Sequence, residues 1–535
     1  MIRMQTATLA VLMLCLSGLV TAQSEFEQRA AEMLNSIFPD DAPGAVAVVS
    51  RDGEVIFNQA FGMANIGLDV PLETTHVFRL ASVTKQYAAA AILALIEDGE
   101  LALDDPISKF LPEFPVGEVT IHQLLNHTSG IKSYTAIDGY MTSEAIRADV
   151  STDELVAMFA DEPVDFEPGE QFRYNNSGYV LIGAIIEAVT EQPWNTFIRE
   201  RLLLPQGIET TDAYADQAVL AGRVQGYAGP AENPIRAPFL SMTQPHAGGS
   251  LMGTALDVDR WNWALHTGRV LSSDSYLQMI TPDGAATQAR NGQGYGYGIG
   301  VSEWFGRPVY NHGGGIFGFS TYALWLPAEA LSVVVLSNRI GPGWSPENLS
   351  LRLIGLAMNQ PYPADLEPVA ANADVLAEFE GTYRIDEQTV RTLRVDNGQL
   401  ISQRQGSQEF VVYPVADDRL AFEDSLTSYT VERNESGDVV ALALQTGWGG
   451  APERAAKISS DIQLRESVNV SEQNLQRLLG QYELQPDFVL TVSIQNGQLQ
   501  VQATGQGPII MQAESNTRFF NNQVGADIEF SVPEV

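Results

Sequence analysis

Ser82 and Lys85 stand three residues apart at the start of a run of strong helix formers, residues 86–96. On a helix, positions i and i+3 lie on one face, so the Lys85 ammonium is expected beside the Ser82 hydroxyl. A serine becomes a good nucleophile when a neighbouring base takes its proton, and burial lowers the pKa of a lysine enough for that role. The pattern therefore indicates nucleophilic chemistry at Ser82. A helix cap followed by a surface lysine is the structural alternative.

A second Ser-x-x-Lys pattern occurs at Ser129 and Lys132. Gly130 follows its serine, and the next residues carry no helical pattern, so the i, i+3 geometry is not assured there. Residues 127–130 are instead typical of a turn.

Two other segments carry groups that can complete a site around Ser82. Tyr174 and Asn176 lie in a segment expected to be an extended loop, where residues two apart can face one cleft. A tyrosine near an ammonium group can relay a proton, and an asparagine can bond a substrate amide. His312 precedes three glycines, residues 313–315, which would let a ligand approach the backbone and an N–H reach an oxyanion. A capping loop and a glycine-rich hairpin are the alternatives.

The motifs of several other enzyme classes are missing from the sequence. It contains no Gly-x-Ser-x-Gly and no His-Glu-x-x-His, and the glycines of residues 292–298 do not complete Gly-x-Gly-x-x-Gly. The six histidines do not cluster with metal-ligand spacing. No metal cluster therefore stands out in the sequence.

The elements that must position these residues point to an α+β fold. Residues 45–49 and 55–57 flank Arg51-Asp52-Gly53, which is typical of a β-hairpin. Helical and turn-rich segments then alternate up to about residue 340, with further strands expected at 299–301 and 332–336. We expect helices packed on a mainly antiparallel sheet.

The last third of the chain changes to short strands separated by turns, and it repeats. Gly381-Thr382-Tyr383 recurs as Gly480-Gln481-Tyr482, and Asn397-Gly398 recurs as Asn496-Gly497, each 99 residues on. A constant offset predicts two copies of one all-β barrel domain. The second copy is short, because the counterpart of residues 439–444 would lie beyond residue 535. Either it closes differently or it lacks its last strand.

Composition and charge narrow the partners and the compartment. Residues 1–22 have the positive start, apolar core and small residues of a signal peptide, and the only cysteine, Cys15, lies inside them. We therefore expect a secreted or periplasmic protein without a stable membrane anchor. The net charge of −36 disfavours nucleic acid and anionic lipid as partners.

Taken in order, Ser-x-x-Lys, Tyr-x-Asn and His-x-Gly resemble the motifs of serine hydrolases related to class C β-lactamases and D-Ala-D-Ala peptidases. The flanking residues 78–82, 123–130 and 248–254 agree, and the similarity covers about residues 25–345. The overall plan is closest to the D-aminopeptidases, which have a catalytic domain followed by two β-barrels, and in which a loop of the last barrel restricts entry to the site.

The resemblance implies a role for each candidate. Ser82 would form an acyl-enzyme, and Lys85 and Tyr174 would share the acid and base work in proportions left open. Asn176, His312 and Gly314 would bind substrate, and the N–H groups of Ser82 and Gly315 would form the oxyanion hole.

These patterns together predict a signal peptide at 1–22, a hydrolase domain at 23–359, a linker at 360–374, and barrel repeats at 375–466 and 467–535, the second of which lacks the counterpart of the last strand or closes differently.

One departure from the β-lactamase pattern bears on the substrate. Those enzymes carry a lysine where this chain has His312, and a neutral histidine is a weaker anchor for a carboxylate. His-x-Gly is the form found in related D-aminopeptidases and some esterases. The resemblance therefore implies an aminopeptidase or amidase that releases N-terminal D-amino acids from short peptides, with no metal or organic cofactor. A carboxylesterase is the main alternative, ahead of a D-Ala-D-Ala carboxypeptidase, a β-lactamase or a non-catalytic peptide-binding protein. The partner would be a small peptide, amide or ester, and the resemblance admits a homodimer.

Overall fold

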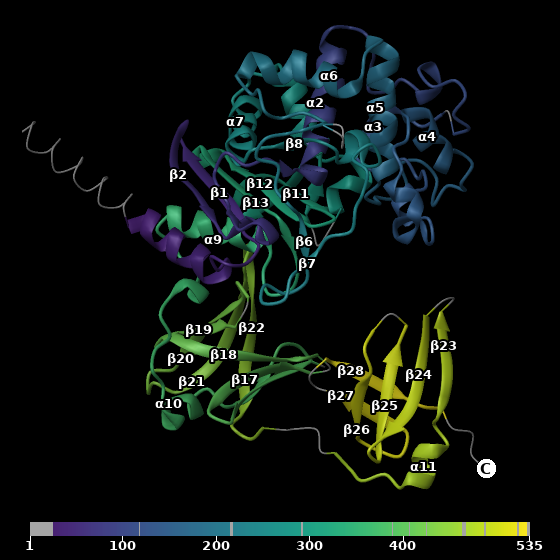
Figure 1. Ribbon diagram of the computed structural model, residues 1–535. Coiled ribbons are helices and arrows are strands. Elements are labelled where there is room, and N and C mark those ends of the chain that lie inside the picture. The colour runs from purple at the N-terminus through teal and green to yellow at the C-terminus, as the bar shows by residue number, and fades with distance from the viewer. Residues whose placement is uncertain are drawn as a thin grey trace, which may run out of the picture. The chain divides into compact units, whose positions relative to one another are not determined.

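The structure is a computed structural model that forms two compact units, Met1–Pro361 and Tyr362–Val535, each of which is taken by itself (Figure 1). It describes residues 25–531 apart from residues 117, 215–217, 290–292, 388, 406, 424, 463–466, 486–487, 505 and 522–523. The expected signal peptide, residues 1–22, lies outside the described residues.

The first unit is built on a seven-stranded sheet in the order β2-β1-β13-β12-β11-β10-β9. Every neighbouring pair is antiparallel. Its strands are β1 (Ala45–Arg51), β2 (Glu54–Phe61), β9 (Gly294–Tyr295), β10 (Gly300–Trp304), β11 (Arg307–Ile316), β12 (Phe319–Leu326) and β13 (Leu331–Ser337). The expected hairpin, late strands and antiparallel sheet are confirmed.

Helices cover both faces of this sheet (Figure 1). Helix α7 lies over one face, and α9 with the helical residues 25–37 lies against the other. The helices of the unit are α2 (Thr84–Glu97), α3 (Ile121–Leu125), α4 (Thr152–Ala160), α5 (Asn176–Thr190), α6 (Trp194–Ile198), α7 (Ala255–His266), α8 (Ser273–Ile280) and α9 (Pro346–Ala357). Three short sheets pair β3 (Met63–Asn65) with β4 (Val70–Pro71), β5 (Phe78–Arg79) with β8 (Met252–Gly253), and β14 (Arg339–Ile340) with β6 (Tyr227–Ala228) and β7 (Ile235–Arg236).

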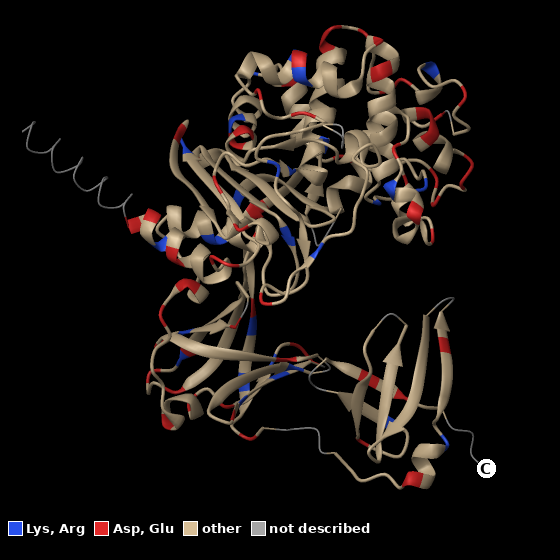
Figure 2. Ribbon diagram, viewed as in Figure 1, with Lys and Arg blue, Asp and Glu red and all other residues tan. Residues whose placement is uncertain are grey.

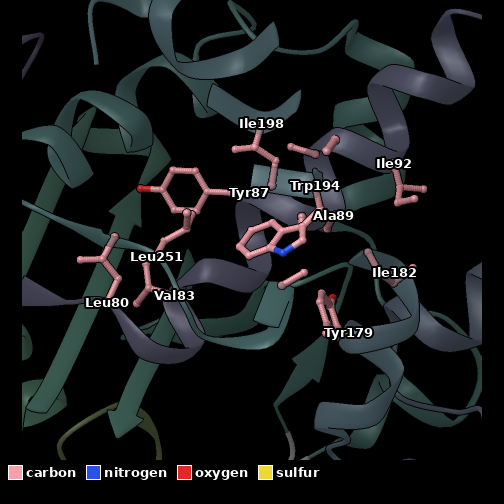
Figure 3. Packing of buried hydrophobic residues seen from close by; sticks show 14 of the residues in the cluster. Leu80, Val83, Tyr87, Ala89, Ile92, Tyr179, Ile182, Trp194, Ile198 and Leu251 are labelled. Carbon is pink, nitrogen blue, oxygen red and sulfur yellow. The ribbon is translucent and has the colours of Figure 1, made fainter. Parts of the chain in front are cut away.

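Helix α2 runs through the centre of the helical layer. Its residues from Thr84 to Leu95 are all buried, so it is enclosed on every side rather than amphipathic. The alanine run keeps the helix slim enough for α5 and α6 to pack closely against it. Figure 3 shows part of this core around Tyr87 and Trp194. Tyr87 also stacks on Trp261 with ring centroids 4.2 Å apart. A helix held this firmly fixes the residues at its N-terminus.

The second unit begins with a closed eight-stranded barrel. Its strands are β15 (Gly381–Arg384), β16 (Val390–Asp396), β17 (Gln399–Arg404), β18 (Glu409–Ala416), β19 (Arg419–Phe422), β20 (Ser428–Arg433), β21 (Val439–Thr446) and β22 (Gly449–Ser459), and β22 closes the ring by pairing with β15. Helix α10 (Ala373–Ala377) precedes the barrel. Part of the expected linker packs on it, since the Tyr362 hydroxyl donates to the carbonyl of Gly447.

The second repeat forms a six-stranded open sheet among the described residues. It contains α11 (Glu472–Gln476), β23 (Gly480–Gln485), β24 (Phe488–Gln495), β25 (Gln498–Ala503), β26 (Ile509–Ala513), β27 (Arg518–Asn521) and β28 (Ala526–Glu529). The fold class, an α+β hydrolase domain followed by two all-β domains, is confirmed.

The 99-residue repeat extends to backbone detail. Asn397 and Asn496 both have φ near +50°, as a tight type I′ hairpin turn requires. The Tyr383 hydroxyl donates to the carbonyl of Phe379, and the hydroxyl of Tyr482 repeats this bond four residues back. The two copies therefore share turn chemistry as well as strand order.

Acidic side chains are spread over the helices and loops of the first unit and recur on the second (Figure 2). No helix in the described ranges is long and apolar enough to cross a membrane.

Candidate active site

Ser82 lies in a single 3₁₀ turn, Ala81–Val83, directly before α2. The residue before it, Ala81, has φ of +49°, a left-handed conformation that an alanine adopts only when its surroundings enforce it. The turn is held from outside, because the Thr321 hydroxyl on β12 donates to the carbonyl of Leu80 at 2.9 Å. The sheet and the helix together therefore fix the position of Ser82.

Lys85 is fully buried, and its ammonium has three acceptors. Nζ lies 3.3 Å from Oγ of Ser82, 2.9 Å from Oδ1 of Asn176 and 2.7 Å from the carbonyl oxygen of Gly248. Burial disfavours the charged form and lowers the pKa of Lys85 to about 7. At neutral pH a large fraction of Lys85 is the free amine, which can accept the proton of Ser82.

Tyr174 lies beside both Ser82 and Lys85. Its hydroxyl is near enough to the Ser82 side chain for that side chain to influence the pKa of Tyr174, and its ring centroid is 4.8 Å from Lys85 Nζ. Although 39% of the residue is exposed, desolvation of its hydroxyl raises the pKa of Tyr174 well above the usual value of 10. The tyrosine is therefore neutral near pH 7. It can relay a proton, but it is not present as a phenolate that could act as the general base.

Asn176 differs from expectation in its setting. It is the first residue of α5, capped by Asn175, rather than part of an extended loop with Tyr174. Its Oδ1 accepts from Lys85, and its Nδ2 donates to Oγ1 of Thr135 at 3.1 Å. The two side chains consequently line different pockets on either side of Ser82, because the helix starts between them.

His312 lies on β11 and is buried. Its Nδ1 donates to the carbonyl of Gly313 at 2.6 Å, so Nε2 accepts from the Tyr295 hydroxyl at 2.8 Å. Burial, followed by the nearby Lys85 charge, lowers the pKa of His312 to about 3. The third motif is therefore uncharged at neutral pH, and both ring nitrogens already have partners.

Gly314 and Gly315 continue β11 past Ser82. Strand β10 pairs with β11 only as far as Asn311, so the outer edge of the later residues faces the Ser82 turn rather than a described strand. A Cβ on Gly314 would come within 2.5 Å of the Leu80 carbonyl oxygen. The missing side chain lets β11 lie against the turn. The expected oxyanion pair, the N–H groups of Ser82 and Gly315, stays a prediction.

Two pockets meet at Ser82. We call the first, of about 680 Å³, the large pocket; it is lined by residues that include Tyr174, Tyr295, His312 and Gly314. The second, the small pocket, has a volume of about 130 Å³ and is lined by residues that include Asn176, Gly249 and Gly315. A carbonyl carbon at Ser82 would place one substituent in each.

The second Ser-x-x-Lys pattern forms no such site. Ser129 is buried in a turn, and Lys132 pairs with Asp165 at 3.2 Å. Gly130, with φ of +70°, sits where a Cβ would clash with the carbonyl of Phe166. The expectation of a turn is confirmed.

Two residues of the site, Tyr295 and Gly248, are not predicted from the sequence. Tyr295, which contacts His312, lies in the glycine-rich segment that was compared only with the dinucleotide-binding pattern. Gly248, whose carbonyl accepts from Lys85, lies in a flanking segment that carried the resemblance without a role. No local pattern in the sequence indicates either residue, because both contribute to the site through contacts with residues that are distant in the sequence.

No group of three or more metal-ligating side chains comes together within the described ranges.

Comparison with known proteins places this site in a family context. The Beta-lactamase family model matches residues 27–355. "Penicillin-binding protein 4*" of Bacillus subtilis (strain 168) is 26% identical over 395 residues, covering 70% of this chain and 86% of that protein. A "D-aminopeptidase" of Gluconobacter oxydans (strain 621H) is 24% identical, covering 79% and 75%. "Esterase EstB" of Burkholderia gladioli is 30% identical, covering 58% and 89%.

Among solved structures, a D-stereospecific amidohydrolase from Streptomyces sp. matches with a TM-score of 0.52 and 27% identity. The match covers 58% of this chain and 94% of that one. Because the family model spans more than half of the chain, the protein belongs to the beta-lactamase family and is a serine hydrolase of that family.

Proposed function

We propose that the protein releases N-terminal D-amino acids from short peptides or amides, through an acyl-enzyme on Ser82. The neutral third motif carries this proposal. His312 has a pKa of about 3 and both nitrogens occupied, so it supplies no cation for a carboxylate beside the scissile bond. This disfavours β-lactams and D-Ala-D-Ala peptides, which carry that carboxylate. The D-aminopeptidase relative and the two C-terminal β domains support the same choice.

In the acylation step, the neutral amine of Lys85 takes the Ser82 proton as Oγ attacks the carbonyl carbon. A carbon–oxygen bond forms, and the carbonyl π electrons move to the oxygen, where the N–H groups of Ser82 and Gly315 would stabilise the charge. The intermediate then collapses. The carbon–nitrogen bond breaks, and the leaving nitrogen keeps the electron pair.

That nitrogen takes up the proton from Lys85 through the Tyr174 hydroxyl, which lies beside the Ser82 side chain. In the deacylation step, water gives its proton to Lys85 and attacks the acyl carbon. Ser82 then leaves with the proton that Lys85 returns. Tyr174 stays protonated before and after each transfer, because burial keeps its pKa high.

A substrate panel tests the proposal. The full-length protein is assayed with D-alanine p-nitroanilide, L-alanine p-nitroanilide and p-nitrophenyl butyrate, with Ser82→Ala as the blank. We expect turnover of the D-anilide well above that of the L-anilide. Fast turnover of the ester alone would remove the aminopeptidase assignment.

Carboxylester hydrolysis by the same nucleophile is the second candidate. It is favoured by the esterase relative, which is the more similar of the two enzymes by identity. A non-catalytic peptide-binding role is tested separately by intact mass after a fluorophosphonate probe. An adduct on the wild type that is lost in Ser82→Ala supports catalysis, and the absence of any adduct contradicts it.

We further propose that residues 1–22 direct export to the periplasm or the medium, as their composition indicates. The intact mass of the protein recovered from each compartment tests this. Recovery of the full chain from the cytoplasm alone would contradict it. A homodimer stays a prediction that light scattering on the purified protein decides.

A further inference from the structure

The small pocket beside Ser82 is apolar in a way that its residue types alone would not reveal. Among the described residues that line it are Met141, Ile146, Leu240, Ile316 and Phe317. These side chains come from three separate parts of the chain, residues 141–146, 240 and 316–317, which only the fold brings together. None of the described residues that line the pocket is Asp, Glu, Lys, Arg or His.

The polar side chains that line the small pocket already have partners within the protein. The hydroxyl of Tyr140 donates to Oε1 of Gln244 at 2.5 Å, and that of Tyr134 donates to the backbone carbonyl of Gln244 at 2.9 Å. The side-chain nitrogen of Gln244, Nε2, donates to the backbone carbonyls of Ala145 and Ala148. A ligand in the pocket therefore meets the apolar surfaces of these groups.

The polar side chains between the small pocket and Ser82 also have partners within the protein. Asn176 bonds Lys85 through Oδ1 and Thr135 through Nδ2. The Thr135 hydroxyl also lies 3.0 Å from Oγ of Ser133. Placing a charged group in this pocket would remove its hydration without supplying a partner, which is costly in free energy.

The position of Tyr174 decides which half of a substrate enters this pocket. The proton that leaves Ser82 must reach the leaving atom, and the Tyr174 hydroxyl beside Ser82 is the group placed to deliver it. Tyr174 lines the large pocket and not the small one. The large pocket is also lined by Arg173 and Glu347, charged residues of a kind that does not line the small pocket among the described residues. The side chain of the acyl group is left for the small pocket.

We propose that the small pocket binds the side chain of the acyl residue and selects uncharged, apolar side chains. The inference rests on the proposed function for the identity of the acyl group, a D-aminoacyl residue. The preference for an apolar side chain applies equally to an ester substrate.

The test varies the acyl side chain while the leaving group stays fixed. The first series is D-leucine, D-alanine, D-aspartate and D-lysine p-nitroanilides. The second compares p-nitrophenyl butyrate with the p-nitrophenyl monoester of succinate, which has a similar length but ends in a carboxylate. We expect kcat/KM to fall by on the order of tenfold or more for each charged side chain relative to the apolar one, since the pocket leaves that charge unpaired.

Variants locate the effect in the pocket. Met141→Asp places a carboxylate at a partly buried lining position. It is expected to lower kcat/KM for the D-leucine anilide and the butyrate by about tenfold, and to leave p-nitrophenyl acetate within about twofold. Leu277→Asp, at a 60% exposed leucine on α8, is the control and should change none of these values. Melting temperatures exclude a folding defect.

The results distinguish a failure of the aminopeptidase proposal from a failure of the pocket assignment. Discrimination in the ester series without anilide turnover would contradict the aminopeptidase and keep the pocket assignment. Turnover of charged and apolar acyl groups at equal rates in both series would overturn the pocket assignment and keep the hydrolase. Equal effects of Met141→Asp on acetate and butyrate would also overturn it.

Discussion

The hydroxyl of Tyr295 lies 2.8 Å from Nε2 of His312, and the other ring nitrogen donates to the carbonyl of Gly313. These two bonds hold the histidine as the neutral tautomer with its proton on Nδ1. A residue of the glycine-rich segment thereby fixes the tautomer of His312, while burial and the nearby Lys85 charge keep that histidine neutral. The neutral histidine is the feature that separates this chain from enzymes with a lysine at that position.

Replacing Tyr295 with phenylalanine should remove the hydrogen bond to Nε2 of His312. The buried Nε2 would lose its donor, so the pKa of His312 should rise, and kcat/KM for the best anilide or ester should fall by about tenfold. Tyr297→Phe is the matched control, because that hydroxyl bonds His122 instead. Selective ¹⁵N-histidine NMR measures the titration of His312. An unchanged His312 spectrum in Tyr295→Phe would contradict the role assigned to this bond.

The acid limb of the activity profile should report Lys85. Its pKa is lowered to about 7 by burial, and only the free amine can accept the Ser82 proton. We expect kcat/KM to rise with pH through about pH 7 and then to level off. The raised pKa of Tyr174 places its ionisation beyond this range. A profile measured from pH 5 to 9 checks the expectation, and a plateau that extends down to pH 5 would exclude Lys85 as the titrating base.

Gly183, in the middle of α5, should be needed for the position of the Gly248 carbonyl. A Cβ on Gly183 would lie 2.4 Å from Cε1 of His246, in the same short turn, His246–Gly248, that carries this carbonyl. Gly183→Ala should push the turn away from α5, weaken the bond to Lys85 and so lower the pKa of the lysine further. The acid limb should then move to lower pH, with a reduced kcat.

Gly178→Ala in the same helix is the control for this substitution. There the new Cβ would meet its nearest atom, the carbonyl oxygen of Leu124, at 3.4 Å, and alanine should stabilise the helix by about 1 kcal/mol. Similar pH profiles for Gly183→Ala and the wild type would show that the turn tolerates the added carbon.

Asp259 should make the stability of the first unit depend on pH. It is 2% exposed on α7, and its Oδ1 accepts from the Ser50 hydroxyl at 2.7 Å. Burial raises the pKa of Asp259 to about 6, above its value in the unfolded chain. Its favourable contribution is therefore complete below about pH 4 and is lost as the pH rises through 6, by roughly 3 kcal/mol at most.

Asp259→Asn should remove this dependence. The melting temperature of the variant relative to the wild type should increase between pH 4 and pH 8. Asp138→Asn, at an exposed carboxylate, should show a much smaller change over this range. A difference between Asp259→Asn and the wild type that stays constant with pH would contradict a buried ionisation at this position.

Local patterns were enough to predict much of this protein. The Ser82–Lys85 spacing before an alanine-rich run predicted a nucleophile on a helix, and Asn-Gly pairs 99 residues apart predicted two barrels. These features depend on helix periodicity and turn conformation, which a few neighbouring residues determine. The fold class and the family followed from such patterns.

The tertiary structure decided how the site is charged and divided. The pKa of Lys85 depends on burial, and the pKa of His312 depends on burial and on the charge of Lys85, which is far away in the sequence. Helix α5 starts between Tyr174 and Asn176, so these two side chains line different pockets. Their spacing in the sequence had predicted that both face one cleft. Desolvation and the pairing of polar groups come from packing between distant segments, so no local pattern of the sequence can specify them.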